Sequence, residues 1–330
     1  MKFLGSLAVV GVLFLLGLLG ATGTVPGVIF GILFPYLAAV VFLGGLGCRV
    51  WIWARTPVPF RIPTTCGQQK SLPWIKQAKL ENPSGLWGVV GRMALEVLFF
   101  RSLIRNTKTK LIEGSKLVYG TSLGLWLGAM AFHWSLLVVL ARHLRLVVHP
   151  APAVVVILAD ADGSLEMGMP VIYLSTILLL AALAYLLLRR LTSPQLRYIS
   201  LPEDYFLLLL LLGVGLSGFF LQHVARTDIV SVKELAMGLV GLHPPIPGAI
   251  GPLFFGHLFL ACVLGAYIPF SKVVHLAGAL LSPTRNLANN NRMARHVNSW
   301  DYPVKVHTYE EYEDELRDKM KGAGIPVERQ

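Results

Sequence analysis

Four of the nine histidines in this sequence lie inside two long apolar runs. His133 and His143 belong to the run from about residue 117 to 148, and His257 and His275 belong to the run from about 252 to 281. Ionisable side chains within a membrane are costly and usually have a function. Two neutral imidazoles on opposite faces of one iron are the axial ligands of a bis-histidine haem. The set therefore predicts two haem sites shared by two helices.

The spacing of these histidines bears on how they would pair. His257 and His275 are 18 residues apart, which is five whole turns of a regular helix and places both on one face. His133 and His143 are ten residues apart, which leaves an angular mismatch of about 80° that helix tilt would absorb. Because the two helices run in opposite directions, we predict that His143 pairs with His257 and His133 with His275. For a single histidine, a structural hydrogen bond or a proton relay is the alternative.

Small residues flank these histidines at positions where a macrocycle would need room. They are Gly128, Ala129, Gly256, Ala277 and Gly278. Close packing of membrane helices explains small residues equally well. Both interpretations stay open at this point.

Six apolar runs are long enough to cross a bilayer, for which about 20 residues suffice. Their approximate ranges are 3–19, 25–54, 117–148, 170–188, 205–224 and 252–281. The first follows a lone Lys2 and has the look of a signal sequence, but we expect it to be a retained helix. Hydrophobic residues make up 55% of the chain and charged residues 14%. An all-α integral membrane protein with six transmembrane helices is the expected fold class.

Positive charge is concentrated between the second and third runs. From Arg49 to Lys116 the sequence has twelve Lys and Arg and three Glu, as the positive-inside rule predicts for a cytoplasmic loop. With an even number of crossings, both termini are then expected in the cytoplasm and the protein in the inner membrane. The net charge of +11 does not predict nucleic-acid binding, because no motif of such a module is present.

The chain therefore divides into four parts. Residues 1–54 are expected to form two N-terminal transmembrane helices, and 55–116 a basic cytoplasmic loop with an amphipathic interfacial helix from Leu86 to Ile104. Residues 117–281 are expected to form a four-helix di-haem cytochrome b core, and 282–330 a soluble cytoplasmic tail with a short helix from Tyr309 to Lys321. Three scattered cysteines are too few for an iron–sulfur cluster of the chain's own.

A cationic, proton-accepting patch is predicted at the outer end of the fifth run, beside the outer haem. Its residues are His223, Arg142, Arg145 and His149. Quinol oxidation needs a hydrogen-bond partner for the hydroxyl and a base for its proton, roles that an imidazole fills. We predict a quinone site there, and the alternative for each side chain is anchoring at the interface.

The two histidine spacings on the third and sixth runs resemble those of the cytochrome b subunit of respiratory nitrate reductase, the gamma subunit family. The segments TPVPFRIP (56–63) and SPTRNLA (282–288) resemble more closely the DsrM family, the membrane cytochromes of DsrMKJOP complexes. With them the resemblance extends over nearly the whole chain. The additional first helix and the long basic loop depart from the nitrate reductase pattern, so that family's quinone-site residues are not carried over.

The resemblance implies two haems b, with His143 and His257 at the outer site and His133 and His275 at the inner site. It implies an electron-transfer subunit of an oxidoreductase complex, which oxidises menaquinol near the outer haem. Its partner would be DsrK, an iron–sulfur subunit similar to heterodisulfide reductase, in dissimilatory sulfate or sulfite respiration. We expect the partner to dock on the basic loop and the tail. The rival prediction is a haemless membrane anchor or a proton-relaying transporter subunit.

Overall fold

Six apolar helices form the framework of this multi-pass membrane protein. The computed structural model describes residues 2–56, 77–105, 108–112, 116–163, 171–225, 227–247, 250–289 and 306–328. Among these residues, six helices are long and apolar enough to cross a membrane, which confirms the predicted number. The spans are Lys2–Ala21, Thr24–Arg55, Leu123–Val147, Leu174–Thr192, Pro202–His223 and Pro252–Phe270. The motif at 57–63, Cys66, Glu166 and His296 lie outside the described residues.

The first two spans contain short departures from α-helical geometry. Helix α1 (Lys2–Leu18) continues into the 3₁₀ turn η1 (Leu19–Ala21). The second span joins α2 (Thr24–Val28), the π-helical turn η2 (Ile29–Leu33) and α3 (Phe34–Arg55). Pro35 is the second residue after the π-helical turn. A proline ring clashes with the carbonyl four residues earlier, here that of Gly31, so the wider turn lies where the clash would occur.

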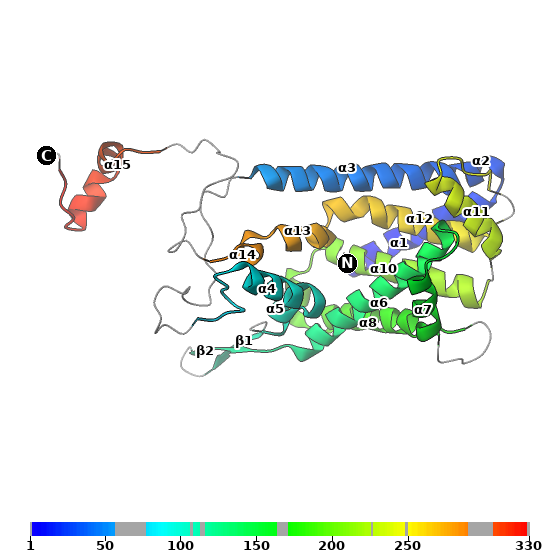
Figure 1. Cartoon of the computed structure of the whole chain (residues 1–330), viewed down its shortest axis with the longest axis horizontal. Coiled ribbons are helices and arrows are strands. Elements are labelled where there is room, and N and C mark those ends of the chain that lie inside the picture. The colour runs from blue at the N-terminus through cyan, green and yellow to red at the C-terminus, as the bar shows by residue number, and fades with distance from the viewer. Residues whose placement is uncertain are drawn as a thin grey trace.

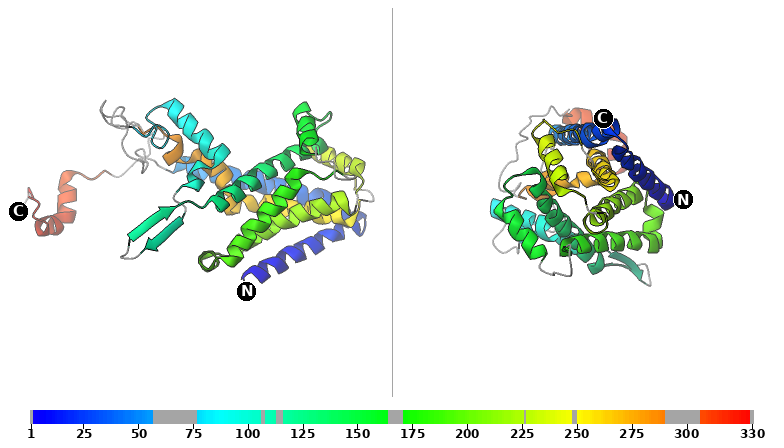
Figure 2. Two further views of the ribbon diagram at one scale, coloured as in Figure 1. Left: turned by 90° about the horizontal axis from the view of Figure 1, so that it is seen from below. Right: turned by 90° about the vertical axis from the view of Figure 1, so that its right-hand side faces the viewer.

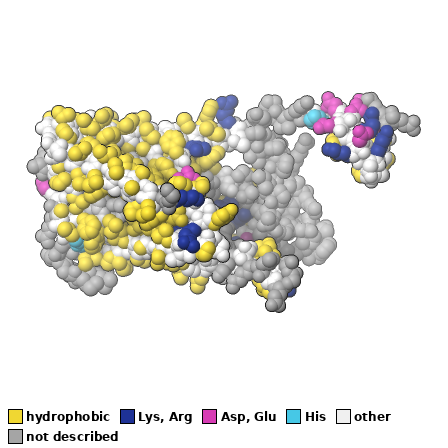
Figure 3. Space-filling view, turned by 180° about the vertical axis from the view of Figure 1, so that it is seen from behind, with side chains coloured by type: hydrophobic (Ala, Val, Ile, Leu, Met, Phe, Trp, Pro, Cys, Tyr) yellow, Lys and Arg dark blue, Asp and Glu magenta, His cyan; other side chains and the backbone are white. Residues whose placement is uncertain are grey.

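The remaining spans pack with the first two into one bundle (Figures 1 and 2). Helix α6 (Leu123–Val147) packs on α8 (Leu174–Thr192), and α10 (Pro202–His223) packs on α8 and α12 (Pro252–Tyr267). Helix α1 packs on α10 and α12, and α3 also packs on α12. Figure 3 shows one face of the bundle covered by hydrophobic side chains, with Lys and Arg towards one end. Such an apolar outer surface is what lipid contact requires.

Two of the small residues flagged in the sequence serve helix packing. A Cβ atom on Gly256 would lie 2.7 Å from Cε2 of Phe14 in α1. A Cβ atom on Gly128 would lie 2.7 Å from the ring of Tyr185 in α8. The space beside Gly128 and Gly256 is occupied by side chains of neighbouring helices, which favours the helix-packing interpretation at these two positions. Close helix approach through small residues is the reason they are needed.

The helix of the sixth span is interrupted towards its C-terminal end. Helix α12 is followed by the 3₁₀ turns η3 (Ile268–Phe270) and η4 (Lys272–Val274) and then by α13 (His275–Leu281). Pro269 lies in η3, and proline cannot donate the hydrogen bond that continues a helix. The prediction of one regular helix from 252 to 281 was wrong. The argument that five whole turns place His257 and His275 on one face is lost with it.

A helix with a break occupies most of the segment for which an amphipathic helix was predicted. Helix α4 (Leu86–Phe99) is separated from α5 (Arg101–Ile104) by Phe100, whose φ of 46° is left-handed. The indole Nε1 atoms of Trp126 and Trp134 donate to the carbonyls of Phe99 and Leu98, at 2.7 and 3.1 Å. These bonds attach the end of α4 to α6. Its position in the membrane interface stays a prediction.

Several short elements complete the described chain. Strands β1 (Lys108–Ile112) and β2 (Lys116–Gly120) form an antiparallel hairpin, so α6 begins later than the predicted third run. The hairpin was not predicted. Four further helices were not predicted either, namely α7 (Ala153–Asp162), α9 (Pro194–Ile199), α11 (Ile229–Val240) and α14 (Pro283–Asn286). The first three lie between successive spans, and α14 follows α13. The predicted polar helix of the tail is confirmed as α15 (Tyr309–Gly322), which begins with a capping box between Thr308 and Glu311.

Candidate functional site

The structure brings His133 of α6 and His275 of α13 together. Their ring centroids are 6.0 Å apart and the ring planes make an angle of 73°. Nδ1 of His133 lies 2.8 Å from the Ala129 carbonyl oxygen, and Nδ1 of His275 lies 2.8 Å from the Lys272 carbonyl oxygen. Because a carbonyl can only accept, Nδ1 carries the proton and Nε2 keeps its lone pair. This is the tautomer in which Nε2 can bind a metal.

His143 and His257 show the same pattern nearer the other end of the bundle. Nδ1 of His143 lies 2.7 Å from the Val139 carbonyl oxygen. Nδ1 of His257 lies 2.9 Å from Oγ of Ser217, and that hydroxyl donates to the Gly213 carbonyl at 2.7 Å. The hydroxyl proton is thus used, so His257 donates from Nδ1 and its Nε2 is left free.

These two pairs of imidazoles suit a metal whose other ligands come from a macrocycle. Bonds from a metal to an imidazole nitrogen are about 2 Å long, so two rings bound to one metal have centroids about 6 Å apart, as His133 and His275 have. Among the described residues, no group of three or more His, Cys, Asp and Glu could hold a metal ion by itself. Each pair would supply two axial ligands, which is what a b-type haem takes from the protein.

Helix α10 makes room for His257 and holds it. A Cβ atom on Gly218 would lie 3.2 Å from Cε1 of His257, so the adjacent Gly218 lets the ring approach the helix. Ser217 is buried and supplies the oxygen that faces Nδ1. Sequence analysis missed Ser217. The available signal was that it is the one polar residue in the apolar stretch 206–221.

Arg142, which precedes His143, lies in a buried polar cluster. Its Nε is 3.1 Å from Oδ2 of Asp162 at the end of α7, and both side chains are less than a tenth exposed. Its Nη2 donates to the hydroxyls of Ser175 and Thr176 in α8, at 3.2 and 3.0 Å. The guanidinium carbon is 3.7 Å from the ring centroid of Tyr173. The cluster joins α6, α7 and α8 through the Arg142 side chain.

The other three residues of the predicted quinone site have different neighbours. His223 is half-buried at the end of α10, with its ring centroid 4.5 Å from that of Phe219. His149 is exposed, and its Nδ1 is 3.2 Å from Nζ of Lys233 in α11. Arg145 is exposed on α6. The assignment of these residues to a quinone site stays a prediction.

Comparison with known proteins gives matches over most of the chain. The family described as "Nitrate reductase gamma subunit" matches residues 84–296, which include all four paired histidines. A protein of Archaeoglobus fulgidus named "Hdr-like menaquinol oxidoreductase cytochrome b-like subunit" is 42% identical over 282 residues, or 83% of this chain and 84% of that protein. A protein of Archaeoglobus profundus with the same name is 39% identical over 274 residues, or 81% of each chain.

Proposed function

This chain belongs to the nitrate reductase gamma subunit family, and we propose that it is a membrane di-haem cytochrome b that oxidises menaquinol. The observation that carries the proposal is the set of four histidines whose Nδ1 atoms are all engaged, which leaves each Nε2 free to bind iron. The names of both relatives, which describe a menaquinol oxidoreductase cytochrome b-like subunit, support the quinol and the cytochrome.

Haem b, bound by His143 with His257 and by His133 with His275, would supply one-electron redox chemistry. The protein's own contribution is to fix each imidazole. Hydrogen bonds from Nδ1 to a carbonyl or to a hydroxyl set the tautomer and ring orientation, and they raise the basicity of the ligating nitrogen. Such bonds are one of the means by which a protein sets the reduction potential of a haem.

The quinone site is proposed near His143 and His257. Oxidation of a quinol releases two protons with its two electrons, so the site needs a proton acceptor at the membrane surface. His223 is the candidate base, with Arg145 and His149 as cationic neighbours. Arg142 would contribute by holding α6, α7 and α8 together, because its guanidinium is already engaged with Asp162. Protons would be released on the outer side while electrons pass inward.

His223→Ala should leave both haems bound and slow quinol oxidation. Removing a general base typically costs about 10²–10⁴ in rate, and the haem ligands lie elsewhere. The measurement is quinol-dependent reduction of the purified cytochrome, with its absorption spectrum as the check on haem content. The matched control is His243→Ala, in the loop before α12, which should turn over as the unmodified protein does. Unchanged turnover in His223→Ala would remove His223 from the site.

The proposed partner is an iron–sulfur subunit similar to heterodisulfide reductase, DsrK in a DsrMKJOP complex. The "Hdr-like" part of the relatives' names supports this type of partner, and the resemblance to the DsrM family supports dissimilatory sulfate or sulfite respiration. We propose that both termini and the basic segment 55–116 face the cytoplasm, across the inner membrane, and that the partner docks there.

A reduced-minus-oxidised absorption spectrum of the purified full-length chain tests the proposed function. A b-type band, developed on addition of a menaquinol analogue, is the expected result. It would exclude the rival function of a haemless anchor or a proton-relaying transporter subunit. Complete absence of the band from protein purified out of cells that make haem would contradict the proposal.

Ser217→Ala should perturb the haem bound by His257 without removing it. The substitution leaves the Nδ1 proton of a buried imidazole without its oxygen acceptor, and loss of such a partner costs about 1–3 kcal/mol. Loss of a partner that orients a ligand typically weakens metal binding 10–100-fold. Redox titration should show one haem shifted in potential and the other unchanged. Ser217→Thr, which keeps the hydroxyl, is the control, and equal potentials in Ser217→Ala and the unmodified protein would contradict the assignment.

A further inference from the structure

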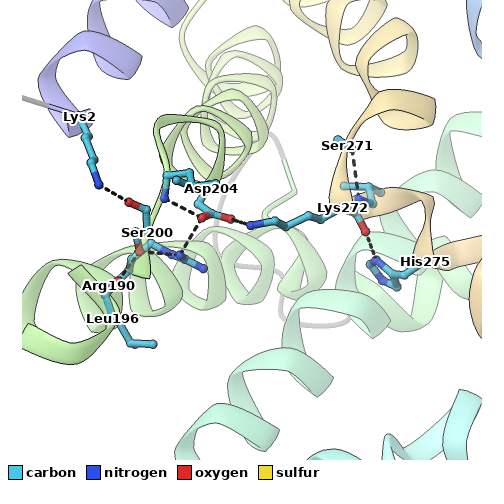
Figure 4. A network of polar contacts seen from close by, with 10 residues as sticks. Lys2, Arg190, Leu196, Ser200, Asp204, Ser271, Lys272 and His275 are labelled. Atoms are coloured by element: carbon cyan, nitrogen blue, oxygen red, sulfur yellow. Dashed lines mark hydrogen bonds and ion pairs between the residues drawn. The ribbon is translucent and has the colours of Figure 1, made fainter. Parts of the chain in front are cut away.

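A charged cluster connects several elements at the end of the bundle opposite Arg142 (Figure 4). Asp204, in the first turn of α10, has Oδ1 at 2.6 Å from Nζ of Lys272 and Oδ2 at 3.5 Å from Nη1 of Arg190. Arg190 donates to Oγ of Ser200 at 2.7 Å, and Nζ of Lys2 donates to the Ser200 carbonyl at 2.8 Å. The cluster thus ties together the ends of α1, α8, α10 and η4.

Lys272 belongs both to this cluster and to the surroundings of a histidine. Its side chain pairs with Asp204, and its backbone carbonyl accepts the hydrogen bond from Nδ1 of His275 at 2.8 Å, as Figure 4 shows. Both bonds are made from one short 3₁₀ turn. The Ser271 hydroxyl oxygen also accepts from the backbone N–H of Val273 at 3.2 Å, which fixes the start of that turn. A shift of the Lys272 side chain would therefore be passed on to the carbonyl that orients His275.

The break in the sixth span makes this connection necessary. A continuous helix would fix the direction of His275 through its own backbone hydrogen bonds. Here two 3₁₀ turns intervene, and the carbonyl of Pro269 receives its hydrogen bond from Nε of Arg49 in α3, at 3.2 Å. Arg49 thus holds the first turn from one side. The pair of Asp204 and Lys272 holds the second turn from another.

The strength of the pair depends on the environment of the carboxylate. The Lys272 side chain is 65% exposed, whereas that of Asp204 is only 8% exposed. An ion pair between fully exposed groups contributes little. Asp204 is shielded, faces two cations, and accepts from the backbone N–H of Leu201 at 2.9 Å, so its position is well determined. The fixed carboxylate then determines the position of the Lys272 ammonium group.

We propose that Asp204 and Lys272 are positioning residues for His275, and through it for the haem that His133 and His275 share. The inference rests on the proposed function, since it assigns them to that haem. The ion pair fixes η4, the Lys272 carbonyl then fixes the Nδ1 side of the imidazole, and the direction of Nε2 follows. Neither residue contacts the haem in this proposal.

Four single substitutions in the full-length protein, with one double variant and His133→Ala as a reference, test the inference. Lys272→Met and Asp204→Asn remove one partner each, whereas Lys272→Arg keeps the charge and Glu203→Gln removes a charge from the exposed residue next to Asp204. Electron paramagnetic resonance of the ferric protein is the main measurement, because its low-spin signals depend on the orientation of the axial imidazoles. The haem signal that is lost in His133→Ala identifies the relevant pair.

Lys272→Met and Asp204→Asn are expected to change that one signal and to leave the other haem as in the unmodified protein. The double variant should change it no more than Asp204→Asn does, because that substitution already removes the pair with Lys272 together with the pair to Arg190. Lys272→Arg and Glu203→Gln should retain both signals. Lys272→Met and Asp204→Asn lie on different elements. If one of them does not accumulate as folded protein, the other is enough to test the positioning role.

Three results would overturn the positioning role. The first is an unchanged signal in a removing variant that still holds both haems, and this would leave the proposed function intact. The second is an equal change in both haem signals. The third is a shift of the reduction potential with no change in signal shape, because this would show an effect of the charge alone. Absence of haem from the unmodified protein would instead contradict the proposed function itself.

Discussion

Replacement of His143 with alanine is expected to remove one haem and to abolish quinol oxidation. The variant loses the Nε2 ligand that the bond from Nδ1 to the Val139 carbonyl leaves free. A single remaining imidazole, His257, cannot fill both axial positions of that iron. The reduced-minus-oxidised absorption band should fall to about half, because in the proposed assignment the pair of His133 and His275 would supply the ligands of the other haem. Quinol-dependent reduction should fall to background, since the lost haem is the one beside the proposed quinone site.

The matched control for this experiment is His243→Ala. His243 also places Nδ1 near a carbonyl oxygen, that of Gly241 at 2.7 Å, but it lies in a loop outside the six spans. Its removal should leave both haems and quinol turnover unchanged. Retention of both haems in His143→Ala would refute the assignment of His143 as a ligand.

Replacement of Asp162 with leucine should destabilise the protein severely. The substitution leaves the buried guanidinium of Arg142 without its counter-charge, and breaking a buried ion pair in this way typically costs about 3–5 kcal/mol. The backbone N–H and the hydroxyl of Ser175 also lose their acceptor, which lies at 2.7 and 2.6 Å. Thermal unfolding of the purified protein in detergent should show a markedly lower midpoint for Asp162→Leu.

The double variant Arg142→Leu with Asp162→Leu separates the charge effect from packing. Replacing both partners of a buried ion pair by apolar residues is often nearly neutral, so the double variant should recover part of the loss. Arg145→Leu, which removes an exposed arginine of the same helix, should change the midpoint little. A double variant less stable than Asp162→Leu alone would show that the uncompensated charge is not the cause.

The six spans were predictable because each is set by the length of one apolar run, which is a local property of the sequence. The break between Lys272 and the end of α12 was not predictable in the same way. Ile268, Pro269 and Phe270 are apolar, so the run continues through the break. A proline within a membrane helix is often tolerated. The end of the helix is also held by Arg49, which lies in another helix and donates to the carbonyl of Pro269.

The proximity of His133 and His275 could be predicted, because residue type, depth and helix direction are enough to bring two histidines together in principle. The groups that hold the four histidines could not be predicted. Ser217 is 40 residues away from His257, and Asp204 is 68 residues away from Lys272. Which side chains of two separate helices face each other depends on helix rotation, and the apolar pattern of a helix surrounded by lipid and protein does not fix that rotation. The same uncertainty explains why the sequence left two interpretations of Gly128 and Gly256 open.

The first helix has a consequence for electron transfer. Helix α12 is held by α1, α3 and α10, and Gly17 of α1 approaches Gly256 so closely that a Cβ atom on Gly17 would lie 2.8 Å from the Gly256 Cα atom. His257 is the next residue along α12, so its backbone is held by the close contact between α12 and α1. Close-packed surroundings resist displacement. If His257 holds a haem iron as proposed, a ligand on such a backbone would move little during one-electron redox chemistry, which would keep the reorganisation energy of the transfer small.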